Sequence, residues 1–112
     1  MKHALFSLAL ALAATLAAGF APSALAQDAG KGKELMSKSG CLGCHANDKK
    51  VVGPSYLEVA SKFRGVKGAE DRIVSHIING GAGVWGQIPM PPHKHLAEAD
   101  VRAMVRYILS LK

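Results

Sequence analysis

The 112-residue chain contains few aromatic residues and little acid. It has three phenylalanines, two tyrosines and one tryptophan, and eight Asp and Glu residues against fourteen Lys and Arg. No segment alternates apolar and polar residues as a half-buried strand does, which argues against a β-sheet fold. The length also excludes solenoids, collagen-like rods and enzymes of several domains. These absences leave one small helical domain with a thin core.

The first 26 residues have the pattern of a leader. A short basic start precedes residues 4–18, which are apolar apart from one serine and one threonine, and residues 24–26 read Ala-Leu-Ala. This pattern is typical of a secretory signal peptide, with cleavage after Ala26. The alternative is a membrane-anchoring helix, because residues 4–21 approach the roughly 18 apolar residues that a span requires. Gly19 and Pro22 favour removal, so we predict a cleaved leader at 1–26, a functional domain at 27–112 and no stable membrane anchor.

The mature domain is small and basic. Removing the first 26 of 112 residues leaves 86, and the formal charge falls from +6 to +5 because Lys2 is lost without any acid. A domain of this size buries only roughly 60–65% of its unfolded surface, so it benefits from an additional stabilising element. The positive charge suits an acidic partner surface or serves solubility. We do not expect an exported chain to bind nucleic acid.

Apolar spacing predicts four short helices, at residues 27–38, 55–63, 69–78 and 98–111. Asp28 stands where it would cap the first helix, and Gly80 where it would end the third. Gly30 and Gly32 each weaken the first helix by roughly 1 kcal/mol, and they mark either a frayed start or a close helix contact. Ala97, directly before the fourth helix, has no side chain that can cap it.

Residues 41–45 read Cys-Leu-Gly-Cys-His, the attachment signature of a c-type haem. Cys41 and Cys44 project from one side of a helical turn, so both sulfurs can form thioethers at one porphyrin edge, and His45 can then reach the iron. A disulfide or a thioredoxin-type pair needs no adjacent histidine. A zinc site that includes His93 and His95 fits poorly, because these histidines are too close in the sequence.

Residues 80–96 have no periodicity and form a long loop for so small a domain, so we expect something to fasten it. A covalent haem would do so through a second axial ligand and would complete the thin core as an apolar disc. Met36 and Met104 lie on apolar helix faces and are expected to pack in the core. Met90 lies among prolines that hold its thioether in a fixed direction, so it is the preferred ligand. The alternatives, which would give bis-histidine ligation, are His76, His93 and His95.

Four pieces of sequence, taken in order, are typical of one family. They are Cys-Leu-Gly-Cys-His at 41–45, Val-Gly-Pro-Ser-Tyr at 52–56, Gly-Val-Trp-Gly-Gln-Ile-Pro-Met-Pro-Pro at 83–92 and Tyr-Ile-Leu-Ser-Leu at 107–111. With them the chain resembles the class I cytochromes c, and specifically the small bacterial periplasmic type that includes short cytochromes donating electrons to nitrite reductase and terminal oxidases. The resemblance covers essentially the whole of 27–112. It implies an all-α class I cytochrome c fold, with four short helices wrapped around one covalently bound haem c and the first and last helices crossing.

The resemblance also implies the residues that hold the haem. It makes Cys41 and Cys44 the thioether attachments, and His45 and Met90 the axial ligands of the iron. Pro54 matches the residue whose carbonyl accepts the N–H of the proximal imidazole, which fixes the tautomer and raises the basicity of the ligand.

Three more residues match positions near the haem. Trp85 matches a tryptophan that donates to a haem propionate, with an ordinary core aromatic as the alternative. Asn79 matches an amide that can donate to the methionine sulfur, with a helix cap as the alternative. His76 falls where relatives carry arginine or histidine near a propionate, or it is a solvated surface histidine. Because histidine titrates near neutrality, we hypothesise that the reduction potential falls as pH rises through the neutral range, and identical pH slopes for the wild type and His76→Arg in voltammetry would refute this.

With both axial positions filled and no acid, base or open iron site, the chain is predicted to be a one-electron carrier and not an enzyme. We expect a soluble, monomeric periplasmic protein with a positive potential, because methionine favours ferrous iron. Its partners are expected to be redox proteins, such as an oxidase, a nitrite reductase or a dehydrogenase, met through a transient interface of under about 1,200 Å². The alternatives are a fixed haem c relay subunit of a periplasmic oxidoreductase complex, and a ligand sensor in which Met90 dissociates.

Overall fold

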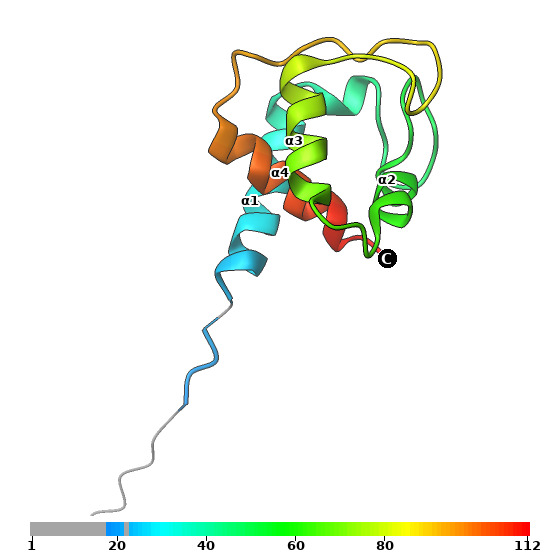
Figure 1. Ribbon diagram of the computed structural model, residues 1–112. Helices are drawn as coiled ribbons and strands as arrows, with labels where there is room; N and C mark the ends of the chain where they lie inside the picture. Colours follow the sequence, from blue (N-terminus) through cyan, green and yellow to red (C-terminus); the bar gives the residue numbers. More distant parts are fainter. Residues whose placement is uncertain (1–17, 22) are drawn as a thin grey trace, which may run out of the picture.

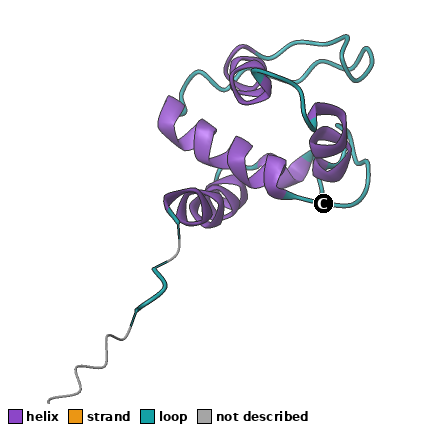
Figure 2. Cartoon of the chain, turned by 60° about the horizontal axis from the view of Figure 1, so that its bottom comes forward, coloured by secondary structure: helices purple, strands orange, loops and turns teal. Residues whose placement is uncertain are grey.

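Four α-helices and one 3₁₀ turn make up the computed structural model, which describes residues 18–21 and 23–112 (Figure 1). In order they are α1 (Ala24–Lys38), η1 (Cys41–Gly43), α2 (Tyr56–Phe63), α3 (Ala69–Asn79) and α4 (Glu98–Ser110). No strand occurs in these residues, and loops join the helices (Figure 2). The prediction of an all-α fold with four short helices is confirmed.

The N-terminal helix begins earlier than its sequence pattern indicates. Most of the predicted leader lies outside the described residues, so its cleavage stays a prediction, and a cut after Ala26 would fall within the first turn of α1. Asp28 therefore stands inside the helix and is not its N-cap, so this prediction was wrong. The Asp28 carboxylate instead pairs with the Arg106 guanidinium of α4. No helix in the described part of the chain is long and apolar enough to span a membrane.

The first and last helices cross at close range, as the resemblance implies (Figure 2). Gly32 is buried at the crossing, where a Cβ atom would overlap the backbone carbonyl of Ala103. Gly30 is exposed, and a Cβ atom there would meet nothing within 4 Å. The prediction of close contact is therefore correct for Gly32 and wrong for Gly30, since only Gly32 lies on the side of α1 that meets α4.

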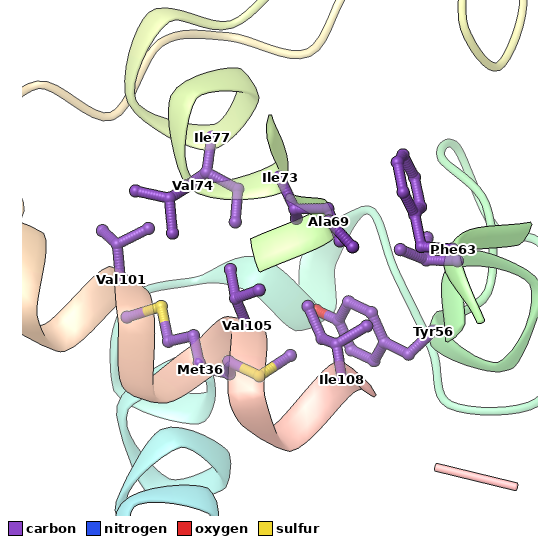
Figure 3. Packing of buried hydrophobic residues seen from close by; sticks show 12 residues of the cluster. Met36, Tyr56, Phe63, Ala69, Ile73, Val74, Ile77, Val101, Val105 and Ile108 are labelled. Carbon is purple, nitrogen blue, oxygen red and sulfur yellow. The ribbon is translucent and has the colours of Figure 1, made fainter. Parts of the chain in front are cut away.

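The core is built mainly on one face of α4, against which the other helices pack (Figure 3). Val101 and Val105 have no exposed surface. Around them lie Met36, Tyr56, Val59, Phe63, Ala69, Ile73, Val74, Ile77, Met104 and Ile108. The predicted core role of Met36 and Met104 is confirmed, because each is only 2% exposed.

The helix ends follow local chemistry. At α2, the Ser55 hydroxyl accepts from the Glu58 N–H at 3.1 Å, and the Ser55 N–H donates to the Glu58 carboxylate at 2.7 Å. These bonds form a capping box. The pKa of Glu58 lies below its usual value, mainly because its carboxylate accepts from the Ser55 backbone N–H. Gly80 ends α3 as predicted, with a positive φ of 66°. Ala97 occupies the N-cap of α4 and makes no side-chain cap, as expected.

Ion pairs tie α4 to its neighbours. Arg102 binds acids of α3 and α4, and Arg106 binds acids of α1 and α3. These acids are Asp28, Glu70, Asp71 and Glu98. Each pair is at least partly exposed to water and contributes little stability, so the network mainly orients helices that the apolar core holds together.

Gly32→Ala should lower the free energy of unfolding by about 1–3 kcal/mol, because the added methyl group must push α1 away from α4. The matched variant Gly30→Ala should raise it by about 0.5–1 kcal/mol, because alanine is the better helix former where space is open. Denaturant unfolding followed by circular dichroism measures both. Effects of the same sign and size would contradict the assignment of the crossing to Gly32.

Ala97→Ser should raise the free energy of unfolding by about 0.5–1 kcal/mol, because a serine hydroxyl can accept from an unpaired N–H in the first turn of α4. Ala99→Ser, two residues further along, is the control and should give no such gain, since it lies inside the helix. Thermal unfolding of both variants checks this. If neither variant gained stability, α4 would have to begin elsewhere.

Candidate haem site

One cavity of about 380 Å³ gathers the residues that the sequence assigns to a haem. Cys41 and Cys44 line it, and so do His45 and Met90. Side chains of α2, α3 and α4 complete the lining, together with residues of the loop at 81–93. The fold therefore brings the predicted attachment residues into one space with both predicted axial ligands, although they come from distant parts of the sequence.

The His45 imidazole is held by three contacts. Its Nδ1 atom lies 2.7 Å from the carbonyl oxygen of Pro54. Because a carbonyl can only accept, Nδ1 carries the proton and Nε2 keeps its lone pair for a metal. The Tyr56 ring stacks on the imidazole, with centroids 5.3 Å apart and planes inclined by 21°. Gly53 lies against the ring, and a Cβ atom there would overlap it. The hydrogen bond to Pro54 is the one that the resemblance implies.

The two cysteines lie at either end of a tight turn. The N–H groups of Cys44 and His45 both donate to the Cys41 carbonyl, at 3.2 and 3.1 Å. No disulfide joins the two cysteines. The described residues contain no group of three or more His, Cys, Asp or Glu side chains that could hold a metal ion. Cys41 and Cys44 are thus not gathered with His93 and His95 into a zinc site.

Met90 is fixed through its backbone. Its N–H donates to the Gly81 carbonyl at 2.9 Å, and the Gly81 N–H donates back to the Met90 carbonyl at 3.0 Å. Within the intervening segment, the Gly83 N–H donates to the Gly86 carbonyl at 2.7 Å. Gly81 lies two residues beyond the end of α3, so these bonds attach the loop that carries Met90 to the end of that helix. Backbone hydrogen bonds therefore fasten this loop, for which the sequence predicts a haem ligand.

Of the other predicted site residues, two line the cavity and one lies outside it. Trp85 and His76 line the cavity, whereas Asn79 does not. The Asn79 side chain is exposed, and its amide donates to the Ser75 hydroxyl at 3.2 Å, one turn back in α3. The predicted hydrogen bond from Asn79 to the Met90 sulfur is therefore absent from this structure, because the side chain turns back along its own helix.

Three lining residues received no role, or a lesser one, in the sequence analysis. Tyr56 is 3% exposed, and its hydroxyl has no hydrogen-bond partner among the described residues, so burial raises its pKa. Arg72 lies one turn before His76, a spacing that could have revealed it. His93, considered only as an alternative ligand, lines the cavity with its Nδ1 atom 3.3 Å from the Ile77 carbonyl oxygen.

The lining fits a haem. Val52, Val84 and Ile88 all line the cavity, and they are 46%, 48% and 69% exposed. Large apolar side chains that gather on one exposed surface mark a place where an apolar partner or ligand binds. A porphyrin disc would cover them, while the thiols and the oriented imidazole supply the means of attachment and ligation.

Comparisons with known proteins agree with this site. The family model described as cytochrome c matches residues 29–112. Cytochrome c-551 of Allochromatium vinosum is 48% identical over 91 residues, which cover 81% of this chain and 92% of that protein. The crystal structure of wild-type Nitrosomonas europaea cytochrome c552 matches with a TM-score of 0.69 and 40% identity, over 71% of this chain and 99% of that one. The chain therefore belongs to the cytochrome c family and is an electron-transfer protein with one covalently bound haem c.

Proposed function

We propose that the protein is a periplasmic electron shuttle in which Cys41 and Cys44 attach the haem, and His45 and Met90 are its axial ligands. The observation that carries the proposal is the convergence of these four side chains on one cavity. When bound, haem c supplies a one-electron couple between ferric and ferrous iron. The chain supplies attachment, orientation and a partly apolar surrounding.

The two proposed ligands are positioned in different ways. The Pro54 carbonyl accepts the Nδ1 proton of His45, which increases the basicity of the Nε2 lone pair. Met90 offers a neutral thioether, which favours ferrous iron and supports a positive reduction potential. Because the imidazole and the Met90 backbone are both held by the protein, we expect little rearrangement when the oxidation state changes.

The proposed ligands of the iron favour an electron carrier over an enzyme. Two axial ligands leave no open position on the iron for a substrate. We therefore assign the cavity to holding the haem, with redox proteins as transient partners. An oxidase, a nitrite reductase or a dehydrogenase would suit this role.

The proposed location and free diffusion are tested together. Periplasmic extract from cells that express the full chain should contain a haem-stained species of small monomeric size, with a mass equal to residues 27–112 plus haem. Migration with a large enzyme would instead support a fixed relay subunit. An intact N-terminus in the membrane fraction would contradict removal of the leader.

Met90→Leu should abolish the weak long-wavelength sulfur-to-iron absorption band of the oxidised protein and leave the haem covalently attached. The band requires a thioether on the iron, whereas attachment depends on Cys41 and Cys44. The matched control is Met36→Leu, which makes the same exchange of side chain at a core position that is 2% exposed. This control should keep the band, because the exchange of methionine for leucine conserves volume.

The absorption spectrum of the intact oxidised protein shows whether the band is present, and acid-acetone extraction shows whether the haem is covalently attached. A band that persists in Met90→Leu would exclude Met90 as the ligand and indicate another methionine. A wild-type protein that lacks the band would instead favour a histidine of the cavity. Haem that is lost on extraction from the wild type would exclude thioether attachment and overturn the proposed site.

A further inference from the structure

Arg72 is a cation of the cavity lining that no acid of the described chain neutralises. Glu70 and Asp71 directly precede it in α3. These two acids bind Arg102 and Arg106 of α4 instead. An arginine with two carboxylates beside it in the sequence is thus left without a partner at the edge of the cavity.

The guanidinium of Arg72 is held in place by an aromatic ring. Its central carbon lies 5.5 Å from the centroid of the Phe63 ring, within the range of a cation–π interaction. Phe63 is only 9% exposed and also lines the cavity. A guanidinium that lies over a ring keeps the N–H donors along its edges available. The stacking therefore orients Arg72 and still leaves its donors for a ligand.

The charge of the lining indicates what this ligand is. Among the described lining residues, Lys50 and Arg72 carry full positive charges, and none is acidic. His76 follows Arg72 by one helical turn, so both lie on the same side of α3. A haem is an apolar disc whose anionic groups are its two carboxylates, and a carboxylate that leaves water needs a hydrogen-bond donor or a cation. Arg72 offers both in one group.

We propose that Arg72, oriented by Phe63, binds a haem carboxylate and thereby raises the reduction potential. The inference rests on the proposed function, since it requires the haem to lie in this cavity. A positive charge near the iron disfavours the ferric state, which carries one more positive charge than the ferrous state.

Redox titration of the haem-loaded protein tests the proposal. Arg72→Gln should have a lower reduction potential than the wild type, because the variant lacks the positive charge that disfavours ferric iron. The matched control is Arg64→Gln, which removes the same charge from an exposed residue that does not line the cavity. Its potential should stay close to that of the wild type.

Arg72→Lys keeps the charge and loses the planar fork of donors. The haem carboxylate bands in its redox-induced infrared difference spectrum should therefore move relative to the wild type, and this measurement decides the question even if Arg72→Gln fails to mature. Equal potentials for Arg72→Gln and Arg64→Gln would overturn the proposal, as would unchanged carboxylate bands in Arg72→Lys. A change confined to the rate of electron transfer to a partner would also do so. A wild-type protein without covalent haem would instead refute the proposed function.

Discussion

The crossing of α1 over α4 is the contact on which the rest of the structure depends. Helix α4 packs against every other α-helix, and Gly32 allows α1 to approach it without a side chain between the two backbones. Met36 of α1 and Met104 of α4 then lie in the core and also form part of the cavity lining. The haem site is therefore built directly on the helix crossing, with no intervening layer.

The two sides of the site differ in what the protein fixes. At His45 the side chain itself is held, by the Pro54 carbonyl and by the stacked ring of Tyr56. At Met90 the backbone is held, by the reciprocal bonds to Gly81. An imidazole needs a defined ring plane and tautomer to ligate iron, whereas a flexible thioether needs mainly a defined starting point. Each kind of restraint thus suits its ligand.

The helices could be predicted from the sequence because they depend on local patterns, and the candidate haem residues could be proposed from it for the same reason. The apolar spacing located α2, α3 and α4 to within one residue at each end. It failed for Asp28 and Gly30, since both predictions depended on where α1 begins and which side of it meets α4. A motif also does not specify the direction of a side chain, and the Asn79 amide here donates to Ser75.

Two contacts between different segments of the chain were not predicted from the sequence. The backbone bonds of Gly81 with Met90 involve atoms that every residue has, so no residue type signals them. The role proposed for Arg72 requires that the two acids before it in the sequence bind other residues. Glu70 and Asp71 do so, because they form ion pairs with arginines of α4. Such competition between ion pairs is decided only when the helices are packed.

The backbone bonds between Gly81 and Met90 have a consequence for the loop that carries the proposed ligand. They join main-chain atoms and do not involve the thioether, so the path of the loop does not depend on which side chain stands at position 90. Another side chain at this position would start from the same point of the backbone. The fold could therefore present a different ligand to the cavity without a different loop.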